Sequence, residues 1–139
     1  MDSPTCPETG KPMIRDERPM TLTYKGASTT FDMPGWYCDE SGESIHTGED
    51  MKTSDRQLNK LKAQVEGVLD PSTIRRIRKK LGLTQKEAGR LIGGGPNAFQ
   101  KYESGEILAS HAISSALLLL DQNPDSLVVL RKQAEMVMA

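Results

Sequence analysis

Two short segments have the residue types and spacing of a zinc-binding turn, but each lacks one ligand. They read C-P-E-T-G, beginning at Cys6, and C-D-E-S-G, beginning at Cys38. A zinc knuckle has two thiolates in the pattern C-x-x-C-G, since structural zinc takes four nitrogen or sulfur ligands. Thr9 and Ser41 occupy the positions of the missing thiolates, and a neutral hydroxyl is a poor zinc ligand. Half of a ligand set is therefore present.

We expect an N-terminal domain without metal, its zinc site lost. A site built from Cys6, Cys38, His46 and a nearby carboxylate is the alternative that would retain zinc, although its spacing does not match a knuckle. His46 is otherwise expected to be a solvated loop residue. A reducing compartment disfavours a permanent bridge between two cysteines. In place of the ion we expect hydrogen bonds of Thr9 and Ser41 within their turns, together with apolar packing. The apolar residues expected to pack there are Phe31, Met33, Trp36 and Tyr37.

A second constellation lies in the C-terminal half. Thr84 and Glu87 have the spacing of a capping box, in which each side chain bonds the other residue's backbone N–H. The short helix that follows should end at the glycines 93–95, and Pro96 should begin another helix through Tyr102. Two short helices joined by a glycine turn are typical of a helix-turn-helix, whose second helix enters the major groove of DNA.

Within that second helix, Asn97 and Lys101 are four residues apart and share a face. Asparagine can bond adenine with both ends of its amide, and lysine can donate to guanine. Phe99 and Tyr102 should face the core. As alternatives, Asn97 could make only local hydrogen bonds at the helix start, and Lys101 could be a solvated surface residue.

Basic and polar residues around this constellation suit the DNA backbone. Helix N-termini bind phosphates through their free N–H groups, and lysine and arginine add attraction that is independent of sequence. The run R-R-I-R-K-K could equally be only the solvated face of a helix. The residues expected to contact the backbone are Thr84, Gln85, Lys86, Arg76 and Lys79.

These residues must be positioned by an α+β chain. The N-terminal part predicts about three antiparallel strands, at 20–24, 27–33 and 36–38, with a turn at Pro34-Gly35. A linking helix is expected over 48–68. We place an N-terminal domain at 1–68 and a C-terminal helix-turn-helix domain at 69–139. The five helices of the latter are expected from Pro71 to about Leu81, at 85–92, at 96–102, at about 110–121 and at about 125–137.

The last two helices carry dense apolar residues. Their predicted stripes are Ile113, Leu117 and Leu120, followed by Leu127, Leu130 and Val137. So much apolar surface in a small domain suggests a homodimer through the C-terminal domain. Core packing within the monomer is an equally good interpretation of the first stripe.

Composition and charge narrow the function. Residues 1–50 hold four basic and ten acidic residues, whereas 51–139 hold 14 basic and nine acidic ones. An acidic front and a basic back favour two partners of opposite charge. No stretch is apolar enough to span a membrane, and no signal peptide is evident, so we expect a cytoplasmic protein. No catalytic triad pattern or phosphate-binding loop is present, which argues against an enzyme.

The segment L-G-L-T-Q-K-E-A-G-R-L-I-G-G-G-P-N-A-F-Q-K-Y-E-S-G closely resembles the XRE-type helix-turn-helix of MqsA-type antitoxins. The two N-terminal frames look like the paired zinc knuckles of that family, in degenerate form. The resemblance implies an N-terminal domain that neutralises a messenger-RNA-cleaving toxin. It also implies a dimeric C-terminal domain that represses its own operon at a palindromic operator.

The resemblance also assigns residues. The family's base-reading Asn and Arg fall on Asn97 and Lys101, and the second is a departure because lysine is a point donor and not a planar fork. XRE repressors pair an arginine of the first helix with the glutamate of Y-E-x-G, here Arg78 with Glu103, as an architectural ion pair. The alternative function is a stand-alone transcriptional regulator whose N-terminal domain senses a ligand or redox state.

Overall fold

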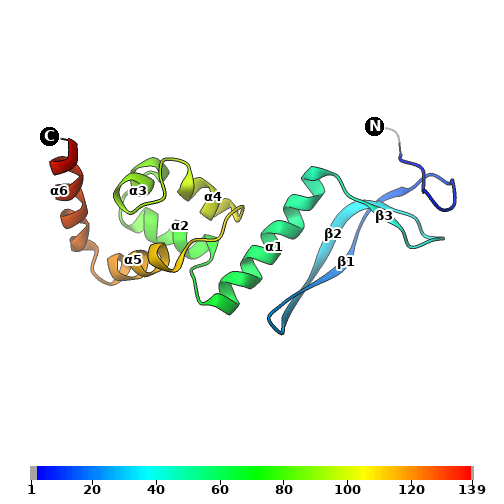
Figure 1. Cartoon of the computed structure of the whole chain (residues 1–139), viewed down its shortest axis with the longest axis horizontal. Coiled ribbons are helices and arrows are strands. Elements are labelled where there is room, and N and C mark those ends of the chain that lie inside the picture. Colours follow the sequence, from blue (N-terminus) through cyan, green and yellow to red (C-terminus); the bar gives the residue numbers. More distant parts are fainter. Residues whose placement is uncertain (1–2, 139) are drawn as a thin grey trace. The chain divides into compact units, whose positions relative to one another are not determined.

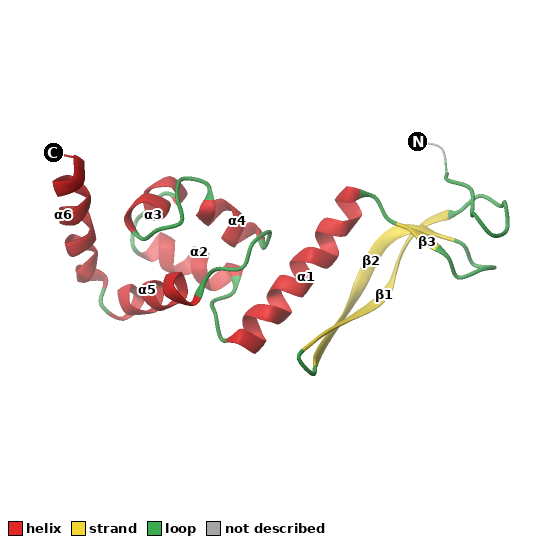
Figure 2. Ribbon diagram, viewed as in Figure 1, coloured by secondary structure: helices red, strands yellow, loops and turns green. Residues whose placement is uncertain are grey.

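The computed structural model describes residues 3–138 and shows the predicted α+β architecture (Figure 1, Figure 2). An antiparallel sheet of three strands comes first, and the α-helices of the described range follow it. The chain divides into two compact units between Leu61 and Lys62, inside the first helix. No helix in the described part of the chain is long and apolar enough to cross a membrane.

The strands pair in sequence order, β1–β2–β3. Their bounds are β1 (Ile14–Tyr24), β2 (Ala27–Tyr37) and β3 (Ser44–Ile45). The helices are α1 (Gly48–Glu66), α2 (Pro71–Lys80), α3 (Gln85–Leu91), α4 (Ala98–Ser104), α5 (His111–Gln122) and α6 (Leu127–Met138), with a 3-10 turn η1 (Pro124–Ser126) before α6. The five helices after α1 are those expected for the C-terminal domain.

The hairpin of β1 and β2 dominates the N-terminal unit. Lys25 and Gly26 reverse the chain with positive φ angles of 48° and 83°, as a tight two-residue hairpin turn requires. Toward this turn, exposed and half-buried residues alternate along both strands. The alternation gives the hairpin one polar face and one partly covered apolar face.

The strands are longer than predicted, and the turn predicted at Pro34-Gly35 is wrong. Both residues lie within β2, opposite Glu17 and Asp16 of β1. Strand β3 pairs only with the last two residues of β2. Pro34 therefore has a neighbouring strand on one side only, and such a position tolerates proline.

His46 is not the solvated loop residue that the sequence predicted. Its Nδ1 lies 2.8 Å from the carbonyl oxygen of Pro34, and its Nε2 lies 3.1 Å from the hydroxyl of Ser44. The imidazole packs edge-on against Tyr37, with ring centroids 5.8 Å apart. A Cβ on Gly35 would overlap this imidazole, so the glycine gives His46 room and does not bend the chain.

Helix α1 begins at a reciprocal cap. The Thr47 hydroxyl accepts the Asp50 N–H at 3.1 Å, and the Asp50 carboxylate accepts the Thr47 N–H at 2.9 Å. Arg15 of β1 donates two further bonds to this buried carboxylate and lies over the ring of Trp36. The bonds from Arg15, with smaller contributions from Thr47, hold the pKa of Asp50 well below its usual range. The two bonds from Arg15 to Asp50 join β1 to the first turn of α1.

The helix starts of the C-terminal unit agree with the prediction. The Asp70 carboxylate accepts the Thr73 N–H at 2.8 Å, and Pro71 occupies the first helical position of α2. Thr84 and Glu87 form the complete capping box at the start of α3, each bond being 3.1 Å long. Both helices therefore begin where local side chains satisfy their first N–H groups.

The core of this unit is aliphatic apart from two aromatic rings. Phe99 and Tyr102 of α4 pack edge-to-face with centroids 5.4 Å apart, as predicted for the inner side of that helix. The buried cluster consists of Ile74, Ile77, Leu83, Ala88, Leu91, Ala98, Phe99, Tyr102, Ala109, Leu117, Leu120 and Leu127. Every one of the five helices after α1 contributes to it.

The turn between α3 and α4 depends on glycine. Gly93, Gly94 and Gly95 have φ angles of 137°, 97° and 90°, which side-chain-bearing residues rarely adopt. The N–H of Gly95 donates to the carbonyl of Gly89 at 3.3 Å, and a Cβ on Gly89 would overlap the carbonyl oxygen of Gly95. The close approach of these two backbones sets the geometry of the turn.

Two details of the C-terminal helices differ from the prediction. Helix α4 begins at Ala98 and not at Pro96, because Asn97 takes the N-cap position. Val137 was placed on a core stripe but is 75% exposed, whereas Leu127 of the same helix is buried.

We predict that Gly89→Ala destabilises the C-terminal unit by about 2 kcal/mol, the typical cost of overpacking a filled site, although alanine favours a helix. Gly82→Ala is the control, since Gly82 has a φ of 72° but open space around it and should cost only about 1 kcal/mol. Urea unfolding of both variants measures the difference. A Gly89→Ala protein at least as stable as Gly82→Ala would contradict the close approach.

Candidate functional site

Helix α4 presents a polar face. Asn97, at its N-cap position, and Lys101 are exposed, whereas Ala98, Phe99 and Tyr102 are buried. The Asn97 backbone has φ −106° and ψ −3°, and its side chain makes no capping hydrogen bond. The local role considered for Asn97 is therefore not the one seen here, and its amide remains available to an outside partner.

An ion pair fixes α4 to α2. Arg78 donates to both carboxylate oxygens of Glu103, at 2.7 and 2.8 Å, and a third bond reaches the carbonyl of Leu83 at 2.8 Å. Both charged side chains are largely buried, with exposed fractions of 11% and 6%. The carboxylate raises the pKa of Arg78 through its hydrogen bonds. Two parallel bonds define orientation as well as distance, so they orient the helix that carries Asn97.

The residues predicted to contact the DNA backbone divide into two groups. Lys79, Lys86 and the hydroxyl-bearing Thr84 are exposed, and Gln85 is half-buried in the first turn of α3. The hydroxyl of Thr84 is already used in the capping box, so its contribution there is structural. Lys86 and Lys79 present solvated ammonium groups of the kind that attracts phosphate.

Arg76 has an intramolecular partner that the sequence did not reveal. Asp121 of α5 binds Arg76 at 3.0 Å and Lys80 at 2.9 Å. The bonds from Arg76, followed by those from Lys80, lower the pKa of Asp121 to about 2, so this carboxylate is charged at neutral pH. Asp121 lies 45 residues from Arg76, and no local pattern relates the two.

The two N-terminal turns face each other. The Cys6 sulfur lies 3.3 Å from the Ser41 hydroxyl, and the Cys38 sulfur lies 3.6 Å from the Thr9 hydroxyl. Each hydroxyl therefore bonds the thiol of the opposite turn. The predicted bonds within the turns are also present, since Thr9 accepts the N–H of Lys11 at 3.3 Å and Ser41 accepts the N–H of Glu43 at 3.1 Å. Both cysteines are buried in one cluster with Met13, against which Trp36 packs. Of the four apolar residues predicted to support this site only Trp36 joins the cluster, and Met13 was missed.

The donor set of this site does not fit zinc. Two thiols and two hydroxyls fall short of four nitrogen or sulfur ligands, and the described residues contain no group of three His, Cys, Asp or Glu side chains able to hold a metal ion. Hydrogen bonds from Ser41 and Thr9, with a smaller one from Cys38, lower the pKa of the Cys6 thiol to about 6. The site thus stabilises a thiolate with hydroxyl groups.

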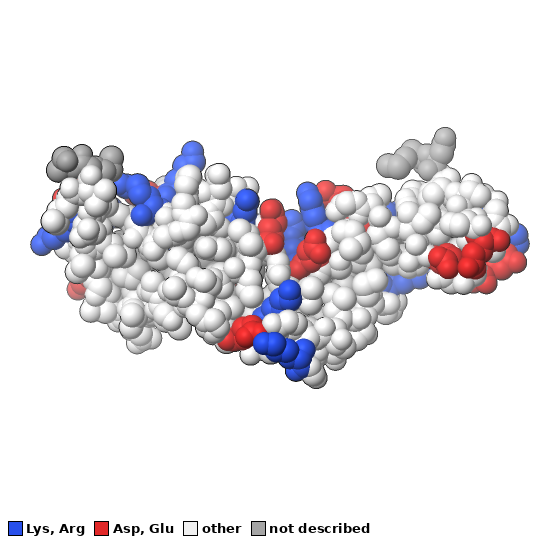
Figure 3. All heavy atoms as spheres, in the orientation of Figure 1, with Lys and Arg blue, Asp and Glu red and all other residues white. Residues whose placement is uncertain are grey.

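Carboxylates surround the two turns. Figure 3 shows acidic side chains grouped at the end of the N-terminal unit that carries the turns. Lys11 and Arg18 pair with two of them, Glu40 at 2.6 Å and Asp39 at 2.6 Å. The exposed carboxylates of the turns are Glu8, Asp39, Glu40 and Glu43. This end of the unit keeps an acidic surface after internal pairing.

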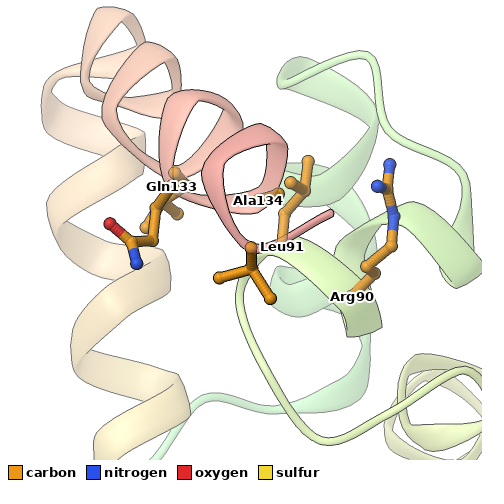
Figure 4. Close-up of a pocket in the computed structure, with 6 residues that line it drawn as sticks. Arg90, Leu91, Gln133 and Ala134 are labelled. Carbon is orange, nitrogen blue, oxygen red and sulfur yellow. The ribbon is translucent and has the colours of Figure 1, made fainter. Parts of the chain in front are cut away.

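An apolar surface extends along α5 and α6. The exposed residues are Leu118, Leu119, Val128, Val129, Met136 and Val137. Beside them, a hollow of about 260 Å³ lies between α3 and α6. Figure 4 shows Leu91 of α3 and Ala134 of α6 at this hollow, with Arg90 and Gln133 beside them. Exposed apolar surface of this density is typical of an interface.

Comparisons with known proteins match nearly the whole chain. The family model described as the antitoxin component of bacterial toxin-antitoxin system, MqsA, matches residues 1–131. Antitoxin MqsA of Escherichia coli (strain K12) is 34% identical over 133 residues, covering 94% of this chain and 100% of that protein. The similarity therefore includes the two turns and the helix-turn-helix.

We predict that Cys6 titrates with a midpoint near pH 6, well below the ordinary thiol value of 9.0. The ultraviolet absorbance of the thiolate, measured beside the peptide band, should rise as the pH passes through this midpoint. The rise should be absent in Cys6→Ser. Because the folded pKa is lowered, the ionised Cys6 adds stability above about pH 9 that is lost as the pH falls through 6. The sample must first be shown to lack zinc, since a bound metal would also ionise the thiol. A midpoint near 9 in metal-free protein would refute the hydrogen-bonded thiolate.

Proposed function

The chain belongs to the MqsA family of antitoxins, and on that premise we propose that it neutralises a messenger-RNA-cleaving toxin through its N-terminal unit and represses its own operon through its C-terminal unit. The observation that carries the repressor function is the exposed face of α4. Asn97 and Lys101 lie on a helix that Arg78 and Glu103 fix in place. A rigidly mounted amide and ammonium can read base edges in a major groove.

Backbone contacts would position this helix on the duplex. Exposed Lys79 and Lys86 supply charge, and Gln85 lies beside the free N–H groups that open α3. Arg76 is a weaker candidate than the sequence implied, because Asp121 already binds it. The ammonium group of Lys101 is a point donor, whereas the planar guanidinium of an arginine could make two parallel hydrogen bonds to guanine. We therefore expect Asn97 to contribute most of the discrimination between bases.

The palindromic operator requires two copies of the helix-turn-helix. We place the homodimer contact on the apolar surface of α5 and α6, whose exposed side chains include Leu119 at 71% and Val129 at 67%. A two-fold dimer pairs the same surface patch on both chains. Two copies of α4 would then face two half-sites of one operator.

We assign toxin binding to the N-terminal domain predicted from the sequence, residues 1–68 with the linking helix. Ribonucleases that bind RNA are commonly basic, and complementary charge accelerates and selects association. The exposed carboxylates around the two turns supply the acidic surface. We propose that this unit acts without a metal, because its donor set does not fit zinc.

Two other interpretations receive less support. The stand-alone regulator would need no toxin, and membership in a family of antitoxins favours the antitoxin. The same membership supports a regulatory and not an enzymatic protein. A repressor of its own operon acts where the DNA is, so we place the protein in the cytoplasm.

We predict that Asn97→Ala weakens binding to promoter DNA of its own operon by ~1–3 kcal/mol while binding to unrelated DNA barely changes. The fold should be intact, because the Asn97 side chain is exposed and caps nothing. Lys79→Ala is the matched control: it should weaken both DNAs alike and reduce the salt slope by about 1. Fluorescence anisotropy over a salt series measures both quantities. Equal losses on the two DNAs for Asn97→Ala would show that this residue does not read bases.

We predict that Leu119→Asp combined with Val129→Asp converts the protein to a monomer and lowers its operator affinity. Both side chains are exposed in the monomer, so the fold should survive and only the association be lost. Light scattering coupled to gel filtration measures the mass, with Lys132→Asp as a charged control on an exposed polar position of α6. A double variant that remains dimeric would place the dimer contact elsewhere.

A further inference from the structure

The thiol pair Cys6 and Cys38 has no role in DNA reading or in toxin binding as proposed above. Both residues are buried, with exposed fractions of 1% and 4%, and they lie in the same small cluster. Neither is in a disulfide. Two thiols that lack the other ligands of a metal site can still carry out one reaction together, which is their oxidation to a disulfide.

The crossed hydrogen bonds of the two turns bring both cysteines into the same small site. Crossed bonds run from Cys6 to the Ser41 hydroxyl at 3.3 Å and from Cys38 to the Thr9 hydroxyl at 3.6 Å. Both cysteines also belong to one buried cluster with Met13. A thiol held beside a second thiol has a resolving partner, as reversible oxidation requires.

Access to the pair depends on the N-terminal turn. Within this turn the Cys6 N–H donates to the carbonyl of Lys11 and the Gly10 N–H donates to the carbonyl of Cys6. One isolated bridge joins Thr5 to Pro12, and the ion pair of Lys11 with Glu40 is exposed. These few bonds lie outside the β1–β2 ladder. The turn can therefore open and expose Cys6 while the hydrogen bonds between β1 and β2 stay intact.

We propose that Cys6 and Cys38 form a peroxide-sensitive dithiol, which a small hydroperoxide converts to an intrachain disulfide that links the two N-terminal turns. The Cys6 thiolate attacks one peroxide oxygen, the O–O bond breaks, and the other oxygen leaves as water or an alcohol after taking up a proton. Cys6 is then a sulfenic acid. The Cys38 sulfur attacks the Cys6 sulfur, the S–O bond breaks, and the hydroxyl leaves as water with the Cys38 proton. Two electrons pass from the thiols to the peroxide.

The disulfide would join residues 32 apart and close the N-terminal turn onto the β2–β3 turn. In a reducing compartment, thiol–disulfide exchange with low-molecular-weight thiols would reverse it. The oxidised form should therefore be transient, and it should hold more firmly the acidic surface that carries Glu40 and Glu43. This inference does not require the DNA or toxin assignments.

Hydrogen peroxide titration of the reduced full-length protein tests the proposal. Intact mass should fall by two hydrogen atoms, both thiols should disappear together in a denaturing thiol assay, and a non-reduced peptide map should contain the Cys6–Cys38 crosslink. Dithiothreitol should restore the starting mass. The midpoint of thermal unfolding should be higher for the oxidised form.

The variant Cys38→Ser separates the two steps, since Cys6 should then stop at a sulfenic acid that dimedone traps in stoichiometric yield. Cys6→Ser should react slowly and yield no dimedone adduct at Cys38. Three results on the wild type would overturn the proposal. The first is Cys6 oxidised to a sulfinic acid while Cys38 stays reduced, and the second is crosslinks found only between chains. The third is that both thiols stay intact at a peroxide dose that fully oxidises free glutathione. These wild-type readings stand even if a variant fails to fold.

Discussion

The polar face of α4 exists because residues outside this helix hold it in position. Seven residues are too few for a helix to be stable in water, where fewer than about 12 are marginal. Three constraints replace intrinsic stability: Phe99 and Tyr102 in the core, the two-bond pair of Arg78 with Glu103, and the backbone contact that only Gly89 permits. The candidate recognition surface is therefore a property of the whole C-terminal unit.

The two N-terminal turns have their shape from the backbone. In each, the cysteine carbonyl accepts the N–H of the glycine four residues later at 2.9 Å, and that glycine has a φ of 72° or 78°. Neither the hydrogen bond nor the glycine conformation requires a metal ligand at the residue before the glycine. Thr9 and Ser41 can therefore occupy that position, and their hydroxyls bond the opposite sulfur where a thiolate would bind an ion. Burial of Met13 adds apolar contacts that a metal-centred turn would not need.

Local chemistry made much of this structure predictable, and long-range packing limited the rest. Helix starts depend on residues three apart, so the caps at Asp70 and Thr84 could be predicted correctly. The fit of Gly35 around His46 and the binding of Arg76 by Asp121 join residues 11 and 45 apart, and neither leaves a periodic signal. Gly89 did leave a signal in the sequence. It is a glycine inside a helix of good helix formers, and such a glycine often marks a close packing contact. Exposure of Asn97 and Lys101 followed from helical spacing, whereas the ion pair of Arg78 with Glu103 that fixes their helix followed only from the family resemblance.

The N-cap of α4 shows how stability and recognition compete for one side chain. Asparagine at an N-cap ordinarily bonds the second or third N–H of its helix, and losing such a bond costs about 1 kcal/mol. Asn97 makes no such bond, although the same unit caps α2, α3 and α5 with side-chain oxygens. Under the proposed function this difference has a cause, since an amide committed to its own backbone could not pair with adenine. The anchors from Arg78 and the core offset the missing cap, and sites where local stability is given up in this way are commonly functional.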